Sequence, residues 1–169
     1  MIDSIINKFF KKTIYIKFSD EWISVKHVET GNTIEDKPLL AIKQNQKGEN
    51  IVYAIGSEVE QLPNDTTISI HNGFSHPRVC INDFEIAQTT LMHFIRKAVN
   101  KKLMIRPIII MHPKKDLQGG LSQIEGKAIK ELATVVGAQK CYVWVGRELK
   151  DVEMISLNFP PQDGPINIE

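Results

Sequence analysis

Few residues of this sequence combine the type and spacing that catalysis or metal binding requires. The five histidines show no H-x-x-x-H or H-E-x-x-H spacing, which predicts that they form no metal site; they are His27, His71, His76, His93 and His112. No G-x-S-x-G elbow is present, so serine-based hydrolysis has no support. The two cysteines, Cys80 and Cys141, lack a C-x-x-C partner and predict neither a disulfide framework nor a zinc site.

One segment has the composition of an anion site. Residues 112–120 read HPKKDLQGG, with a lysine pair and a glycine pair before an expected helix start. Helix N-termini bind anions readily, but the segment lacks the G-x-x-x-x-G-K-[ST] pattern of a nucleotide-binding P-loop. We interpret it as a solvated loop between a strand and a helix, with anion binding as the alternative.

Composition predicts one soluble domain. The chain has 169 residues, 42% of them hydrophobic and 24% charged, with a net charge of +1. A dedicated nucleic-acid binder would carry a strong basic excess, so we expect no nucleic-acid partner. The sparse cysteines suit a reducing cytoplasm, and no apolar run reaches the eighteen residues that would suggest a membrane span.

The first half of the chain reads mainly as short strands. β-Branched and alternating patterns predict strands at 13–18, 22–28 and 39–44, joined as an antiparallel meander. Further strands are expected at 51–56 and 66–70, separated by polar loops. Residues 2–12 instead have apolar side chains at helical spacing, which predicts an amphipathic N-terminal helix.

The second half alternates between helices and strands. Asn82-Asp83 offers a helix N-cap, and residues 108–111 read as a strand buried on both faces. Ser122 and Glu125 form a capping box for a helix to about residue 136, followed by a strand at 141–145 and a short helix at 147–157. The tail at 158–169 is rich in Pro and Gly and is expected to be mobile. A meander followed by alternating units predicts an α/β fold with a mixed sheet.

Specific stretches, in their order and spacing, resemble the N-terminal half of the bacterial actin MreB. The best matches are AIGSEVEQL, the helix that contains LMHFI, and the helix that contains GKAIKELATVVGA. The resemblance runs from the N-terminus to about Pro160. It implies a single actin/RNase H-like first domain over 1–169, with a small inserted subdomain at about 46–80. It also implies that the second, ATP-gripping domain of MreB would begin about where this chain ends.

The resemblance also places a degenerate phosphate loop. Where the family has D-L-G-T, this sequence has Lys17, Phe18, Ser19 and Asp20. Lys17 replaces a carboxylate, and Ser19 adds a Cβ where the family's glycine lets the backbone approach phosphate. The family's catalytic Glu falls at Val145 or Gly146. We therefore expect no catalytic residues, no cofactor and no ATPase activity, unless a register slip lets Asp20 stand in for the missing Asp.

The N-terminal helix resembles the membrane anchor of some MreB proteins. Its candidate membrane-facing residues are apolar side chains flanked by lysines: Ile2, Ile5, Ile6, Phe9, Phe10, Lys8, Lys11 and Lys12. The alternative is a helix that packs on the body of the domain. A single short helix binds a bilayer weakly, so a partner would have to add avidity. The expected location is the cytoplasm, with peripheral contact at the inner face of the cell membrane.

Together these observations predict a non-catalytic, MreB-like half-actin that acts as a protein-binding, regulatory or structural module linked to cell shape. The expected partner is the cytoskeleton or another copy of the chain. Two alternatives remain open. The chain could be one half of a split actin-like ATPase completed by a separate chain. It could also be an actin-like component of a membrane assembly such as the type IV pilus machinery.

Overall fold

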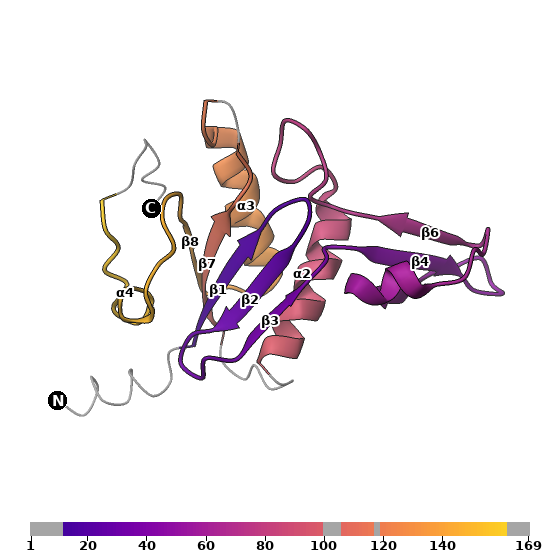
Figure 1. Ribbon diagram of the computed structural model, residues 1–169, viewed down its shortest axis with the longest axis horizontal. Helices are drawn as coiled ribbons and strands as arrows, with labels where there is room; N and C mark the ends of the chain where they lie inside the picture. The colour runs from indigo at the N-terminus through magenta and orange to yellow at the C-terminus, as the bar shows by residue number, and fades with distance from the viewer. Residues whose placement is uncertain (1–11, 100–105, 117–118, 162–169) are drawn as a thin grey trace.

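A computed structural model describes residues 12–99, 106–116 and 119–161, which form two sheets and their covering helices (Figure 1). The larger sheet has the strand order β3-β2-β1-β7-β8. Its strands are β1 (Thr13–Phe18), β2 (Ile23–His27), β3 (Thr33–Asp36), β7 (Ile108–Pro113) and β8 (Lys140–Val143). β1, β2 and β3 pair antiparallel, whereas β1, β7 and β8 pair parallel, so the predicted mixed sheet is confirmed.

Helices cover both faces of the larger sheet. α2 (Phe84–Ala98) and α3 (Gln123–Val135) share one hydrophobic cluster with Ile14, Ile16 and Phe18 of β1. The short helix α4 (Asp151–Ser156) packs on the other face, where Met154 joins Tyr15. β7 is buried along its whole length, as its unbroken apolar run predicted for a strand inside a parallel sheet.

The helices α2 and α3 begin at the N-cap residues that the sequence predicted. The Asp83 carboxylate accepts a hydrogen bond from the Ile86 amide, which satisfies one of the free donors in the first turn of α2. Ser122 and Glu125 form the reciprocal capping box at the start of α3. Among the helices of the described residues, none has the length and apolar content to cross a bilayer.

A smaller sheet extends to one side of the larger one (Figure 1). Its order is β5-β4-β6, built from β4 (Leu40–Gln44), β5 (Asn50–Ile55) and β6 (Ile68–His71), with the 3-10 helix η1 (Gly56–Gln61) after β5. We call this part, residues 40–71, the small lobe. β5 and β6 lie within the range predicted for an inserted subdomain, about 46–80, and β4 precedes it.

The prediction that 39–44 is the third strand of the first meander is wrong. The third strand is β3, and residues 40–44 form the middle of the second sheet. Pro38 is consistent with the break, because it has no backbone N–H to donate to a neighbouring strand. Asp36 secures the turn by accepting from the amides of Lys37 and Ser57, both at 2.8 Å.

Two terminal predictions fall largely outside the described residues. The candidate membrane-facing residues from Ile2 to Lys11 lie outside them. Lys12 is described, and its carbonyl accepts a hydrogen bond from the Ile108 amide at 2.8 Å. Of the predicted tail, only 158–161 is described, and the Phe159 ring lies 5.2 Å from that of Tyr142 and 6.0 Å from that of Trp144.

Candidate functional site

The carboxyl ends of β1, β7 and β8 meet at one edge of the larger sheet, because the three strands run parallel. In open α/β sheets this edge is the usual place for a ligand crevice. The turn at residues 19–22 follows β1, Lys114 and Lys115 follow β7, and Trp144–Gly146 follow β8. The edge therefore brings together the residues that the resemblance assigns to a degenerate phosphate loop and to the position of the family's catalytic Glu.

Lys17 is neutralised by a carboxylate of the chain itself. Its ammonium lies 2.9 Å from Glu148 and 5.7 Å from the centre of the Trp22 ring. The hydrogen bond from Lys17 lowers the pKa of Glu148, which keeps the carboxylate charged. Sequence reasoning identified Lys17 but missed Glu148, because 131 residues separate the two.

Ser19 closes the β1–β2 turn with its own hydroxyl. Its Oγ accepts hydrogen bonds from the amides of Glu21 at 3.2 Å and Trp22 at 3.3 Å. The Ser19 amide donates to the Trp22 carbonyl at 2.9 Å. The amides of Ser19, Glu21 and Trp22 are thus satisfied within the turn itself.

Asp20 points to the outside of the same turn. Its carboxylate is about half exposed and lies 3.6 Å from the Lys115 ammonium. The Asp20 carbonyl accepts from the side-chain amide of Asn72 at 2.8 Å, and Lys115 also donates to the His76 carbonyl. These contacts tie the segment between β6 and α2 to the turn. Sequence analysis did not connect the two segments.

The end of β8 offers no carboxylate at the predicted position. Val145 is apolar, and Gly146 adopts φ 147, where a Cβ would lie 3.1 Å from the Trp144 ring. Trp144 is 2% exposed, and its indole N–H donates to the Arg147 carbonyl at 2.7 Å. The tryptophan thus fixes the backbone where the family's Glu would stand.

His112 is the buried polar residue that sequence reasoning placed wrongly. We assigned it to a solvated loop, but it lies inside β7 and is 1% exposed. Its Nδ1 is 2.5 Å from the Tyr15 hydroxyl, and its Nε2 is 3.0 Å from the Gly146 carbonyl. The carbonyl can only accept, so Nε2 carries the proton and Nδ1 accepts from Tyr15. In a strand, His112 lies on the same face as Ile108 and Ile110. Extending the predicted strand to residue 112 would therefore have indicated that His112 is buried.

Burial sets the ionisation of this pair. It lowers the pKa of His112 to about 4 and raises that of Tyr15 to about 12. Both groups are therefore neutral at neutral pH, and the imidazole acts as a hydrogen-bonding link between β1, β7 and the loop after β8. Across the described residues, no group of three or more His, Cys, Asp or Glu side chains could hold a metal ion.

The family-model match and the similar solved structures agree with one another. A family model described as MreB/Mbl protein matches residues 19–148. The structure of MreB5 of Spiroplasma citri bound to AMPPNP is similar at 18% identity and a TM-score of 0.62, covering 79% of this chain and 38% of that one. A non-polymerising MamK mutant bound to AMPPNP is similar at 14% identity and a TM-score of 0.59, covering 80% of this chain and 41% of that one.

A MamK double helical filament structure is also similar, at 15% identity and a TM-score of 0.56, covering 79% of this chain and 41% of that one. The chain thus spans about two fifths of the length of these solved proteins. At these identities the structures establish the actin-like fold, as the resemblance predicted.

Proposed function

Because the chain belongs to the MreB/Mbl protein family, we propose that it is a non-catalytic actin-like module that works by binding other proteins. The observation that carries the proposal is the ion pair between Lys17 and Glu148, 2.9 Å apart at the edge of the larger sheet where β1, β7 and β8 end. The titles of the solved MreB5 structures name AMPPNP and ADP as ligands of that protein.

An unpaired lysine at this position would attract phosphate, so the ion pair between Lys17 and Glu148 is the decisive feature. Glu148 cancels the charge of Lys17, so this lysine offers phosphate no unpaired cation and Glu148 offers Mg²⁺ no uncommitted carboxylate. Ser19 already occupies two amides of the turn. Phosphoryl transfer depends on placed charges and metal ligands. Of the matched positions, Ser19, Val145 and Gly146 carry no carboxylate, and the Asp20 carboxylate lies 3.6 Å from the Lys115 ammonium.

Calorimetric titration of the purified chain with Mg–ATP and with ADP tests this proposal. We expect no heat of binding and no thermal shift up to millimolar nucleotide, with Spiroplasma citri MreB5 as the positive control. Micromolar binding by this chain would overturn the proposal. As a matched variant, Lys17→Met leaves Glu148 unpaired and should bind no nucleotide either, whereas nucleotide binding that depends on Lys17 would show that the lysine is a phosphate ligand.

We also propose the cytoplasm as the location, with the N-terminal segment as a second, weak contact to the membrane. The support is the sequence pattern of residues 2–12, with isoleucines and phenylalanines on one face and lysines beside them. Co-sedimentation with vesicles containing anionic lipid should recover more of the full chain than of a version that starts at Thr13. Equal recovery of the two would remove the membrane from the proposal.

A further inference from the structure

One face of the small lobe exposes large apolar side chains that no other described residue covers. Residues directly opposite each other on neighbouring strands share a face. Lys43 lies opposite Ile51 of β5 and Ile68 of β6, and Ile70 lies opposite Ala41, two residues before Lys43. The Lys43 ammonium also lies 5.2 Å from the centre of the Tyr53 ring. We call this surface, made by Lys43, Ile51, Tyr53, Ile68 and Ile70, the Lys43 face.

Three of its large side chains are strongly exposed: Ile51 by 44%, Tyr53 by 48% and Ile70 by 57%. They stand on β5 and β6, the two edges of the small sheet. Edge strands of soluble proteins usually carry charged residues or proline, which discourage association. Residues 50–55 and 68–71 contain neither. The two edge strands therefore carry no charged residue or proline that would oppose contact with another chain.

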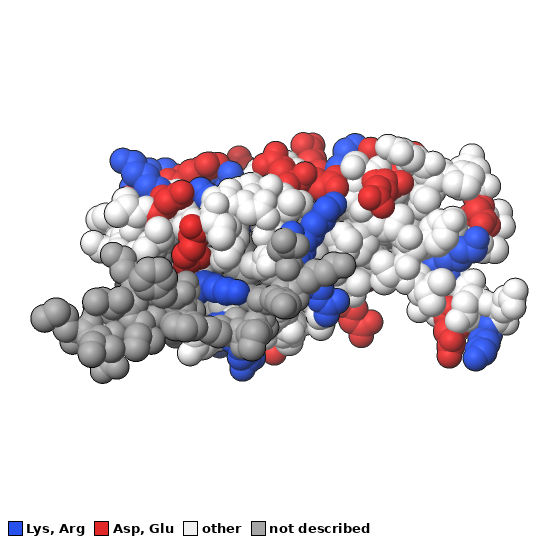
Figure 2. All heavy atoms as spheres, turned by 90° about the horizontal axis from the view of Figure 1, so that it is seen from below, with Lys and Arg blue, Asp and Glu red and all other residues white. Residues whose placement is uncertain are grey.

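The charges of the Lys43 face cancel locally. Lys43 forms an ion pair with Asp65 at 2.9 Å. Contact with Lys43 and Thr67 lowers the pKa of Asp65 to about 2, so the carboxylate is charged at neutral pH. A nucleic acid or an anionic membrane would require an excess of positive charge, which this face does not have. On the face seen in Figure 2, lysine and arginine of the described residues are likewise interspersed with acidic residues.

We propose that the Lys43 face binds the same face of a second copy of this chain. A two-fold interface brings identical surfaces together, so it requires a surface that is apolar or self-complementary in charge. The Lys43 face is both. Its isoleucines and tyrosine would lose water to their counterparts, and each Lys43–Asp65 pair offers both signs of charge to the other copy.

The size of the face sets the strength of the contact. Half of the surface of three or four large side chains is roughly 300–400 Å² per copy, below the ~800 Å² per partner of a standard stable interface. We therefore expect the dimer to be weaker than one with an interface of standard size. Such a contact is reversible and concentration-dependent, and becomes significant where copies are held together by another partner.

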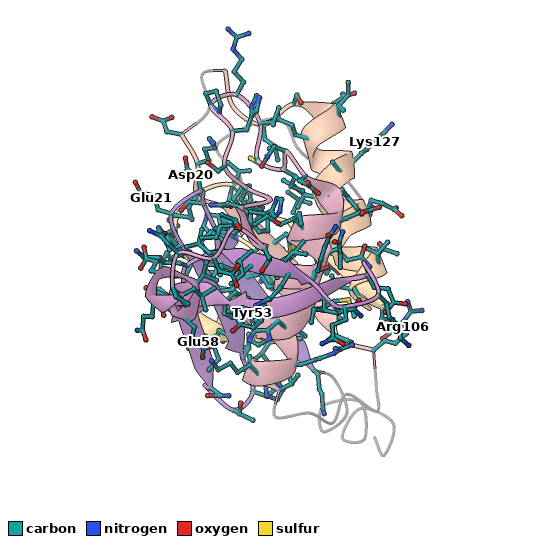
Figure 3. All side chains as sticks on the ribbon, turned by 90° about the vertical axis from the view of Figure 1, so that its right-hand side faces the viewer. Asp20, Glu21, Tyr53, Glu58, Arg106 and Lys127 are labelled. Carbon is teal, nitrogen blue, oxygen red and sulfur yellow. The ribbon has the colours of Figure 1, made fainter. Side chains whose placement is uncertain are left out.

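The face is separate from the sheet edge that carries Lys17. Figure 3 labels Tyr53 well apart from Asp20 and Glu21 of the β1–β2 turn. The inference extends the binding role proposed above by assigning its surface and partner. The two can fail independently, because nucleotide titration reports on the sheet edge and self-association reports on the small lobe.

Sedimentation velocity of the full chain, from about 10 to 500 µM, tests the inference. The wild-type chain should shift from monomer to dimer over this range. Ile70→Glu places a charge at the most exposed of the three apolar side chains and should weaken dimerisation at least tenfold. Ile124→Glu is the matched control, because Ile124 is 81% exposed on α3 and lies outside the face.

A second variant separates the interface from the fold. Exchanging the charges, with Lys43→Asp and Asp65→Lys together, preserves the intramolecular pair and the self-complementarity, so the dimer should persist. Lys43→Glu alone places acidic groups from both copies together and should weaken it. A wild-type chain that stays monomeric throughout, or an Ile124→Glu effect as large as that of Ile70→Glu, would overturn the inference.

Discussion

At the scale of single residues, His112 shows how burial assigns a structural role to a group that is often catalytic. It touches Tyr15 and Gly146, residues that lie on either side of it in space and far from it in sequence. Because burial disfavours the charged imidazolium, the pKa of His112 lies near 4 instead of near neutrality. The imidazole therefore links three segments without serving as an acid or a base at neutral pH.

The lowered pKa of His112 predicts a defined loss of stability in acid. As pH falls below 6.5, the unfolded chain takes up a proton at this site before the folded chain does. The stabilisation is therefore complete above pH 6.5 and is lost as pH falls toward 4, by on the order of 3 kcal/mol from this residue. Urea unfolding of the wild-type chain between pH 7.5 and 4.5 should show this loss.

The matched variant His112→Gln should be less stable at pH 7.5 and should lose less stability on acidification. His27 and His93, whose pKa values are also lowered by burial, are present in both proteins and cancel in the comparison. Parallel pH profiles for the two proteins would contradict the assignment of a buried neutral imidazole.

Sequence alone could supply residue types at the candidate site but not their partners. Lys17 and Ser19 stand out because they replace an acid and a glycine in the pattern of the resembled family. That Glu148 would pair with Lys17, and that the Ser19 hydroxyl would turn back onto its own loop, depends on positions fixed only by the folded sheet. Short-range patterns carry no information on contacts across 131 residues.

At the scale of elements, the segment between β6 and α2 requires glycine at position 73 because a side chain would not fit there. The backbone conformation of Gly73 does not itself require glycine. A Cβ on Gly73 would lie 2.5 Å from the Ala87 amide nitrogen and 2.8 Å from the Asp83 carbonyl, both in the first turns of α2. The Gly73 carbonyl also accepts from the Asn82 amide at 3.0 Å. The segment thus packs directly on the backbone of the helix.

Gly73→Ala should therefore destabilise the protein by roughly 2–4 kcal/mol, because helix backbone cannot move aside as a flexible side chain can. Gly48→Ala is the control. Gly48 has a positive φ of 79 but open space around it, so only the backbone penalty of about 1 kcal/mol applies. Urea denaturation of both variants measures the difference, and equal losses would show that the segment can shift.

Whether a segment is a helix or a strand was predictable where local sequence signals agreed. Which strands pair with each other was not predictable. The caps at Asp83 and Ser122 and the apolar run of β7 each reflect interactions within a few residues. The assignment of 39–44 to the wrong sheet shows that local patterns do not determine strand pairing. Strands of one sheet and of its neighbour have the same alternation, so the pattern identifies a strand without identifying its partners.

At the scale of the whole molecule, the two sheets share one core. Leu40 and Ile55 of the small lobe belong to the same buried cluster as Ile14 and Phe18 of the larger sheet. The rings of Phe18 and Phe74 lie 5.3 Å apart and add to the junction. The small lobe is therefore not an independent unit in energetic terms, even though its hydrogen-bonded sheet is separate.

This shared core predicts a single cooperative unfolding transition. Trp22 and Trp144 report on the larger sheet through fluorescence, whereas far-ultraviolet circular dichroism reports on both sheets. The two signals should change at the same urea concentration. A circular dichroism change that precedes the fluorescence change would indicate that the small lobe unfolds first.

The position of β1 has a consequence for how the protein is made. The strand nearest the N-terminus is the middle strand of the larger sheet, and Thr13 pairs with Ile108. During synthesis, β1 therefore cannot pair with β7 until the chain has grown by another 95 residues. At translation rates of about 5–20 residues per second, that interval lasts roughly 5–20 seconds. During that interval, one side of a strand that is almost entirely buried in the folded protein has no hydrogen-bonding neighbour.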